Sequence, residues 1–240
     1  MLVPITRSKL LLVEGKDEIE FFEALLDSIG VDDVETRSVG GITKFKRNVR
    51  ALKTVSGFHR VKSIGIVRDA DCDPAIAFQS IQNSLIAAGL PVPQTPYCST
   101  PGPPKVNVAV LPAADRNGML EDLCLQTVEQ DPSMACVKAF FRCLRRQLNP
   151  SDYPRIEAKA RVRAFLASRE LLEDDCYTCI QDQTGSCDRS LVPEGSVMMV
   201  HAFLSSRYKP DLDLGMAAKA GYWNLQDPSI AGIRTFLTQL

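Results

Sequence analysis

Two clusters of acidic residues stand out in the sequence, because each comes directly after an apolar run. The clusters are 14–18, which holds Glu14, Asp17 and Glu18, and 69–73, which holds Asp69, Asp71 and Asp73. The runs before them, at 10–13 and 63–67, are typical of buried strands. Carboxylates gathered where parallel strands end hold hard cations such as Mg²⁺. The spacing therefore points to phosphate chemistry.

The functional prediction depends mainly on Glu14, Asp69 and Asp71, and Glu18 is a supporting candidate. Glu14 leaves its strand beside Gly15, which permits a tight turn and a close approach of a ligand. Asp69 and Asp71 alternate at the end of their strand, so both can face a cleft if the chain turns there. Glu18, four residues after Glu14, can face the same space. Such crowded anions repel one another, so a cation must bind, some must take up protons, or the site must splay apart.

The other two acids of the clusters have a simpler explanation. Asp73 precedes Pro74 and is a good N-cap for a helix that starts there. Asp17 is expected to be a solvated first-turn acid that complements the helix dipole. We assign neither of them to the site.

Alternating strands and helices are predicted around the clusters. Apolar runs and turn residues predict strands at 8–14, 34–39, 61–67 and 105–111, and helices at 16–29, 43–56 and 74–88. This order favours an α/β fold with a parallel sheet covered on both faces by helices. If the first and third strands are neighbours in the sheet, the two acidic clusters meet.

The rest of the chain is predicted to be mostly helical. Helices are expected at 119–129, 133–147, 155–168 and 229–238. We predict two domains, an α/β domain at 1–125 and a helical extension packed on it at 126–240. Segment 214–240, with Tyr222 and Trp223, is assigned to packing and not to function.

The composition is that of an ordinary globular protein. Of 240 residues, 45 % are apolar and 24 % are charged, and the net charge is −1. The sequence has no run of about 18 apolar residues that would span a membrane and no signal peptide at its start, so we expect a cytoplasmic protein. The eight cysteines are expected to be mostly small core residues. Cys176, Cys179 and Cys187 could contribute to a zinc site, although a fourth ligand at typical spacing is missing.

Positive charge is unevenly distributed along the chain. No acidic residue occurs between Glu35 and Asp69, a stretch that holds nine lysines and arginines, and a second basic stretch covers 138–169. Both stretches can neutralise phosphates, and the alternative is two solvated basic helix faces. The residues proposed to bind nucleic acid are Lys44, Lys46, Arg47, Arg50, Arg145 and Arg146.

Three other motifs compete for the second acidic cluster, and each fails at a named feature. An EF-hand loop has glycine where this chain has Pro74. A haloacid-dehalogenase phosphatase usually has a small hydroxyl or branched residue where this chain has Asp73, and its nucleophile strand usually comes first. A Walker B strand needs a phosphate-cradling Gly-Lys-Ser/Thr loop, which the sequence lacks.

In the order of its motifs the chain resembles the Toprim domain, the metal-binding catalytic domain of topoisomerases, bacterial primases, small RNA maturases and OLD-family nucleases. The resemblance rests on Leu12-Val13-Glu14-Gly15-Lys16-Asp17-Glu18, Gly40-Gly41 and Ile66-Val67-Arg68-Asp69-Ala70-Asp71. It covers about residues 8–125 and is looser beyond them. The Glu-x-x-x-Glu form and the free-standing length are most similar to OLD-type and stand-alone Toprim-like proteins.

This resemblance implies a role for each matching acid. Glu14 would serve in acid/base chemistry and metal binding, and Asp69 and Asp71 would hold a divalent cation, Mg²⁺ or Mn²⁺. Glu18 would support the metal. Glu121 is the candidate for a further acidic ligand after the next strand, with an ordinary helix-start acid as the alternative.

The implied reaction is metal-assisted hydrolysis of a phosphodiester in DNA or RNA, in defence against mobile elements or in RNA processing. Lys159 is the candidate for contacting the scissile phosphate, although such a lysine is more often simply solvated. The main alternative is a non-catalytic protein that binds nucleic acid or a partner, and phosphatase action on a small phosphoester is a less supported third. An ATP-driven partner would be a separate chain, a homo-oligomer is open, and no membrane partner is expected.

Overall fold

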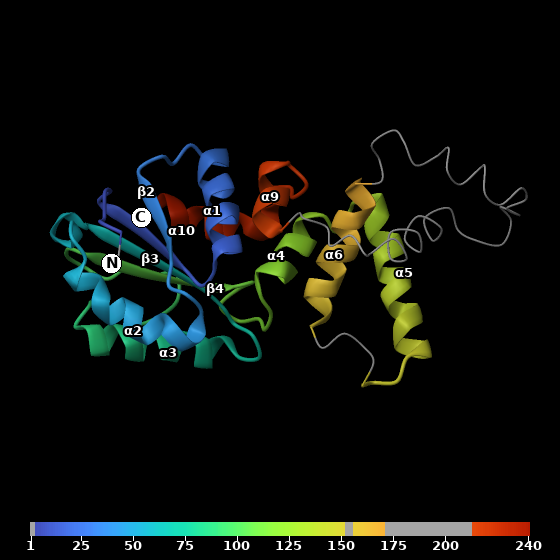
Figure 1. Cartoon of the computed structure of the whole chain (residues 1–240), viewed down its shortest axis with the longest axis horizontal. Helices are drawn as coiled ribbons and strands as arrows, with labels where there is room; N and C mark the ends of the chain where they lie inside the picture. The colour runs from blue at the N-terminus through green and yellow to red at the C-terminus, as the bar shows by residue number, and fades with distance from the viewer. Residues whose placement is uncertain (1–2, 152–155, 171–212) are drawn as a thin grey trace, which may run out of the picture. The chain divides into compact units, whose positions relative to one another are not determined.

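The computed structural model describes residues 3–151, 156–170 and 213–240, which fall into two compact units (Figure 1). The first unit comprises Met1–Leu123 and Leu214–Leu240, and the second comprises Cys124–Asp213. Both predicted acidic clusters belong to the first unit. The predicted domain boundary at residue 125 stays a prediction, because compactness alone does not define a domain. Cys176, Cys179 and Cys187 lie outside the described residues.

A four-stranded parallel sheet forms the centre of the first unit. Its strand order is β2-β1-β3-β4, and the strands are β1 (Lys9–Val13), β2 (Val34–Ser38), β3 (Ser63–Asp69) and β4 (Lys105–Leu111). β1 pairs with β3 from Lys9↔Ser63 to Leu12↔Ile66, so the strands that lead into the two acidic clusters are neighbours. All neighbouring strands are parallel, and their carboxyl ends therefore share one edge.

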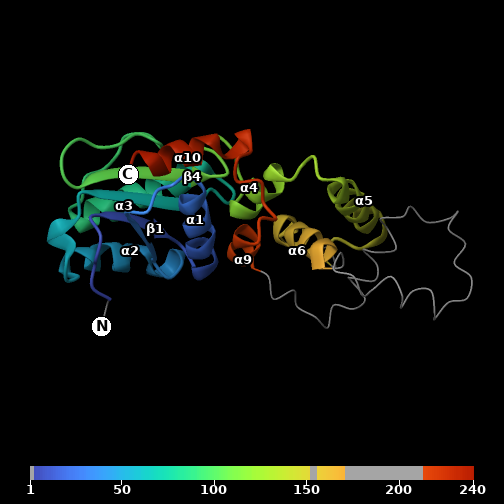
Figure 2. The same ribbon diagram turned by 90° about the horizontal axis from the view of Figure 1, so that it is seen from above.

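Helices cover both faces of this sheet, as Figures 1 and 2 show. One face carries α2 (Ile42–Ala51) and α3 (Pro74–Ala88), and the other carries α1 (Lys16–Ser28) and α10 (Ala231–Thr238). Two further helices are α9 (Leu214–Lys219), which packs against α1, and α4 (Leu120–Thr127), which follows β4 and continues past Leu123 into the second unit. The predicted α/β fold, with a parallel sheet flanked by helices and a helical C-terminal part, is confirmed.

Alternating side chains along the central strands build the core. Leu10, Leu12, Ile64 and Ile66 are at most 2 % exposed and belong to one hydrophobic cluster with residues of α2 and α3. Arg68 comes two residues after Ile66 on the same strand, so the alternation directs a charged side chain to this apolar face. The strand therefore carries a guanidinium into the layer between the sheet and the two helices.

The end of the chain packs on the opposite face of the sheet. Leu240 lies against Gly65 of β3, where a Cβ atom would lie 2.8 Å from Leu240 Cδ2. Trp223 is buried, and its Nε1 donates a hydrogen bond of 3.1 Å to the Leu214 carbonyl. The prediction that segment 214–240 serves packing is confirmed by these contacts.

Several predicted bounds differ from the observed ones, and the difference at β3 matters most for the site. β3 was predicted at 61–67 and runs over Ser63–Asp69, because its pairing with β4 continues to Asp69↔Leu111. Asp69 is thus the last residue of the strand and does not lie beyond its end. α2 was predicted at 43–56 but ends at Ala51, where a 3₁₀ turn over Leu52–Thr54 follows.

The second unit contains the helices α5 (Pro132–Gln147) and α6 (Glu157–Glu170). Asp131 caps α5 through a hydrogen bond of 2.9 Å from Ser133 N and also pairs with Arg169 of α6. α6 was predicted at 155–168 and α5 at 133–147, so both were expected from the sequence. Within the described ranges, no helix is long and apolar enough to cross a membrane.

Candidate metal and nucleic-acid site

The two principal carboxylates lie at the shared carboxyl edge of neighbouring strands. Glu14 directly follows β1, and Asp69 ends β3, which pairs with β1. The sequence predicted this arrangement on the condition that the two strands are neighbours in the sheet, and they are. It follows from the parallel topology, because neighbouring parallel strands place the residues at their ends side by side.

The Gly40-Gly41 turn holds the backbone of Glu14 in place. Gly41 N donates a hydrogen bond of 2.8 Å to the Glu14 carbonyl, and Ser38 Oγ donates another of 2.8 Å to the same oxygen. Gly40 and Gly41 have φ angles of +76° and +84°, which residues with a Cβ rarely adopt. The second motif therefore fixes the position of the first, a contact that the sequence did not reveal.

The Glu14 side chain lies beside the guanidinium of Arg68. Arg68 Nε is 3.5 Å from Glu14 Oε1, and the two side chains are 9 % and 17 % exposed. Arg68 Nη1 also donates to Ser80 Oγ at 3.2 Å, and its guanidinium lies 5.9 Å from the centre of the Phe45 ring. A cation this well buried has to be paired, and it offsets part of the negative charge at the sheet edge.

Asp69 is the electrostatic centre of the acidic edge. Its Oδ1 accepts a hydrogen bond of 2.9 Å from Leu120 N, at the start of α4. Burial, followed by the charges of Glu121 and Glu14 and, more weakly, of Glu18, raises the pKa of Asp69 to about 8 from its ordinary 3.8, although the bond from Leu120 opposes this. The other three carboxylates are therefore close enough for their charges to act on Asp69.

Glu18 also has a structural task. Its Oε2 accepts a hydrogen bond of 2.8 Å from Gly15 N and so closes the first turn of α1. A Cβ at position 15 would lie 2.6 Å from that oxygen, so a larger residue there would require the Glu18 side chain to shift. The start of α4 is built in the same way, since Asp122 Oδ2 accepts from Met119 N at 2.9 Å.

Asp71 differs from the other predicted ligands. Its backbone is in the left-handed region with φ of +51°, and it pairs with Gly118 in an antiparallel bridge. The side chain is exposed, and Asp71 is not one of the residues whose charge shifts the pKa of Asp69. The chain does turn after Asp69 as expected, and Asp71 lies exposed in that turn, so its role as a ligand stays a prediction.

The two acids that we left out of the site behave as predicted. Asp73 is the N-cap of α3, and its Oδ1 accepts hydrogen bonds from Ala75 N at 2.8 Å and Ile76 N at 3.1 Å. Asp17 is exposed in the first turn of α1. Both are helix-start acids.

The donor set suits a hard divalent cation, but the side chains are not gathered around one point. Carboxylate oxygens are the ligands that Mg²⁺ and Mn²⁺ prefer. Among the described residues, however, no three His, Cys, Asp or Glu side chains lie close enough together to hold a metal ion. Repulsion between ionised carboxylates favours such a splayed arrangement. Binding a cation would require Glu14, Asp69 and Glu121 to turn toward one another.

The residues predicted to bind nucleic acid are divided between the units. In the first unit, the four on α2 are all exposed: Lys44, Lys46, Arg47 and Arg50. The others belong to the second unit, where Arg145 and Arg146 are exposed on α5 and Lys159 is exposed on α6. Arg145 pairs there with Glu157. The role of Lys159 stays a prediction.

Most of the basic residues around α2 turned out to be structural. Arg37 donates to the carbonyls of Val3 and Pro4. Arg60 donates to the Ile5 carbonyl, and Lys53 donates to the Gly89 carbonyl. These three side chains thus bind backbone carbonyls of the fold, and we do not count them with the exposed cations of α2.

The expectation that the cysteines are mostly core residues was wrong for those the structure describes. Cys124 is buried and Cys136 is intermediate, whereas Cys72, Cys98 and Cys143 are exposed. Cys72 sits in the turn before α3 and Cys98 in the loop before β4, where no apolar layer covers them.

Sequence reasoning missed Arg68 as a residue of the site. We counted it only as part of a basic stretch, yet it pairs with Glu14 and is 8 % exposed. The position of Arg68 at the end of an apolar run could have revealed this pairing, because a charged residue in a buried strand needs a partner.

The fold and the acidic edge together define the class of protein: an α/β protein with carboxylates gathered at the ends of β1 and β3. The chain belongs to the family described as "Protein of unknown function (DUF3226)", whose model matches residues 8–192. Comparison with curated proteins gives no match.

Two solved structures of the C-terminal region of the Xanthomonas campestris pv. campestris OLD protein are similar to this chain. The structure phased with mercury is 15 % identical, covers 98 % of each chain and has a TM-score of 0.34. The structure phased with iodine is 14 % identical, covers 97 % of each chain and also has a TM-score of 0.34. A likeness at this level carries no weight for the function, and we rest nothing on it.

Proposed function

We propose that the protein is a metal-dependent phosphodiesterase of the Toprim type that hydrolyses DNA or RNA. The observation that carries the proposal is the burial of Asp69 beside Glu14 and Glu121 at the carboxyl edge of the sheet, with its pKa raised to about 8. Perturbed acids in such a position are candidates for functional groups, because a fold gains no stability from crowding them.

Each residue has a defined task in this proposal. Glu14, Asp69 and Glu121 would hold Mg²⁺ or Mn²⁺, with Asp71 joining from the turn and Glu18 giving outer support. Such a cation, when bound, polarises the phosphoryl oxygens and lowers the pKa of a bound water. Glu14 would also take or give the proton, because among the described residues the one histidine, His59, lies on a 3₁₀ turn outside the acidic edge.

The backbone of the nucleic acid would follow the exposed cations of α2, with Lys44, Lys46, Arg47 and Arg50 contacting its phosphates. These contacts would set the position of the strand without reading its sequence. Lys159, Arg145 and Arg146 of the second unit are further candidates for phosphate contacts, with Lys159 at the scissile group.

A second candidate is a non-catalytic protein that binds nucleic acid or a partner through the same basic surface. The observation in its favour is the ion pair between Glu14 and Arg68, together with the splayed carboxylates of the described part of the chain. In this reading Glu14 serves to neutralise a buried cation, and no metal is needed.

The test is cleavage of labelled single-stranded DNA, double-stranded DNA and RNA, with Mg²⁺, with Mn²⁺ and with EDTA. We expect metal-dependent cleavage by the wild type and a loss of about 100-fold or more in Glu14→Gln and Asp69→Asn, since losing even an outer-shell partner costs roughly 10- to 100-fold. Asp17→Asn is the matched control, because Asp17 is an exposed acid of the same helix start. It should cleave like the wild type.

The outcomes separate the two candidates. Cleavage that persists in both site variants would refute the assignment of the site. Salt-sensitive binding of nucleic acid, without cleavage of any substrate in either metal, would favour the non-catalytic protein.

A further inference from the structure

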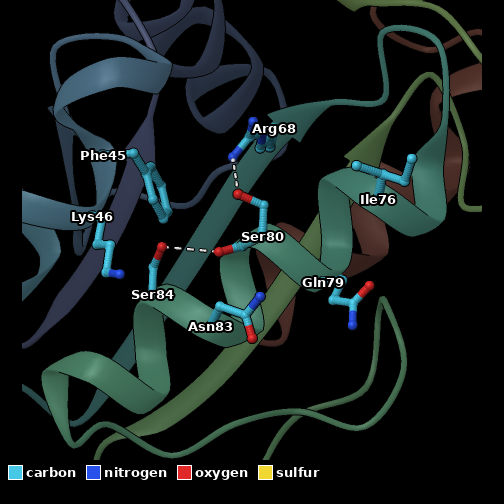
Figure 3. A pocket seen from close by; sticks show the side chains of 8 residues that line it. All are labelled: Phe45, Lys46, Arg68, Ile76, Gln79, Ser80, Asn83 and Ser84. Atoms are coloured by element: carbon cyan, nitrogen blue, oxygen red, sulfur yellow. Dashed lines mark hydrogen bonds between the residues drawn. The ribbon is translucent and has the colours of Figure 1, made fainter.

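A pocket of about 360 Å³ lies between α2 and α3, next to the acidic edge but lined by other residues. Figure 3 shows it from close by, with Arg68 of β3 and Phe45 and Lys46 of α2 facing the helix α3. α3 contributes polar side chains at helical spacing, among them Gln79, Ser80 and Asn83. The volume is at the lower end of the range for small-molecule sites.

The lining of the pocket suits an anion. It contains two cations, Arg68 and Lys46, and no acidic residue. The amides of Gln79 and Asn83 can each donate two hydrogen bonds. The Ser80 hydroxyl can donate as well, because it accepts from Arg68 and its own proton is free to turn toward a ligand.

Arg68 is held in position at the wall of the pocket by neighbouring side chains. It is 8 % exposed, and its guanidinium is held by Ser80 Oγ at 3.2 Å and by Glu14 Oε1 at 3.5 Å. A guanidinium carries five N–H donors, so these two partners leave donors for a ligand. Its Nε is buried and makes no hydrogen bond, since 3.5 Å to Glu14 is an ion-pair distance with poor hydrogen-bond geometry.

We propose that this pocket binds the phosphate group of a nucleotide, with Arg68 as a bidentate donor and Lys46 as a second charge at the rim. A planar guanidinium matches two phosphate oxygens in geometry and charge. Inorganic phosphate would occupy the centre, and the pocket volume leaves room for a sugar beside it. The inference rests on the proposed function only in taking a nucleotide as the ligand, because phosphate binding itself needs no metal.

The position of the pocket gives it a function in that proposal. Arg68 contacts Glu14 on one side and lines the pocket on the other. A phosphate bound here would share the guanidinium with Glu14 and weaken that ion pair. A nucleic-acid strand with one phosphate in the pocket would then have its neighbouring nucleotide beside the acidic edge.

The test is binding of inorganic phosphate and of 5′-AMP to the full chain, measured by calorimetry in EDTA so that cleavage plays no part. We expect saturable binding of both, about tenfold or more weaker in Arg68→Gln, since hydrogen bonds to a charged group are stronger than those between neutral groups. Lys46→Gln should weaken binding severalfold without affecting folding, because Lys46 is exposed. Lys62→Gln removes the same charge from another exposed site outside the pocket and should bind like the wild type.

The outcomes are distinct from those of the cleavage assay. Asp69→Asn, which should lose cleavage, should bind phosphate as the wild type does. No saturable binding by the wild type, or an equal loss in Lys46→Gln and Lys62→Gln, would overturn the pocket. Displacement of 5′-AMP only by a 5′-phosphorylated oligonucleotide would identify a strand end as the source of the phosphate, and equal displacement by the 5′-hydroxyl form would identify the strand backbone. Displacement by neither would overturn the nucleic-acid assignment.

Discussion

Asp69 should make the first unit less stable as the pH rises from 5 to 8, and Asp69→Asn should remove this effect. The pKa of Asp69 is about 8 in the folded chain and has an ordinary value of 3.8. Between these values the folded state keeps a proton that the unfolded state has lost. The stabilisation is therefore complete below about pH 4 and is lost as the pH rises through 8.

The size of the effect follows from the two pKa values. Each pKa unit corresponds to about 1.4 kcal/mol, so a single group of this kind loses about 3–4 kcal/mol between pH 5 and pH 8. The charges that face Asp69 are those of Glu121, Glu14 and Glu18, and the backbone N–H of Leu120 opposes them. If Glu121 or Glu14 shares the proton, the same loss is spread over a wider range of pH.

The assay is urea unfolding in EDTA at several pH values, followed by tryptophan fluorescence. Trp223 is the only tryptophan of the chain and is 2 % exposed within the first unit, so its signal reports on that unit. Asp69→Asn keeps an oxygen that can accept from Leu120 N, and its stability should stay flat from pH 5 to pH 8. Asp17→Asn should follow the wild type.

Two results would refute this reasoning. One is a wild-type stability that does not fall between pH 5 and pH 8, and the other is an equally steep fall in Asp69→Asn. Adding Mg²⁺ at pH 8 gives a further check. A ligand that binds only the folded state raises the unfolding free energy by about 2.7 kcal/mol when its concentration is 100 times its Kd. The wild type should gain this and Asp69→Asn should not.

Three further predictions concern residues that stabilise the first unit through a helix cap, a turn or an ionised side chain. Asp73→Ala removes the N-cap of α3 and should lower the unfolding free energy by about 1 kcal/mol in urea. Gly41→Ala forces a Cβ onto a φ of +84°, so we expect a loss of about 1–3 kcal/mol and, because Gly41 N holds the Glu14 carbonyl, weaker Mg²⁺ binding by calorimetry. Burial alone would raise the pKa of Glu35, but bonds from Thr6, Arg7 and Arg37 lower it to about 2. Ionised Glu35 thus stabilises the fold above about pH 4.5, and this stabilisation is lost as the pH falls toward 2. Between pH 4.5 and pH 2 the unfolding free energy of Glu35→Gln should fall by about 1–3 kcal/mol less than that of the wild type.

The fold was predictable because local signals agreed with the tertiary structure. α3 was predicted at 74–88 and runs over Pro74–Ala88, since Asp73 caps its start and Gly89 ends it with a φ of +60°. β4 was likewise predicted at its observed bounds, 105–111. The predicted end of β3, residue 67, was two residues too early because the last two positions of the strand, Arg68 and Asp69, are charged. An apolar run cannot reveal a strand that continues only through pairing with its neighbour.

The candidate site was predictable as far as strand order determines it. Glu14 and Asp69 follow neighbouring parallel strands, so their proximity required only the sheet topology. The pairing of Arg68 with Glu14 and the bond from Gly41 to the Glu14 carbonyl depend on register and on side-chain conformation. Neither the register nor a side-chain conformation can be read from a single sequence.

A structural role does not require the charge of Asp69. Its hydrogen bond from Leu120 N could be accepted equally well by asparagine, which carries no charge. The charges of Glu121, Glu14 and Glu18 act on Asp69, and the guanidinium of Arg68 pairs with Glu14. Protonation of Asp69 removes the charge of that one carboxylate, whereas a bound divalent cation would offset the charge of several carboxylates at once. A buried acid that destabilises the fold at neutral pH is expected where function, and not packing, requires the charge.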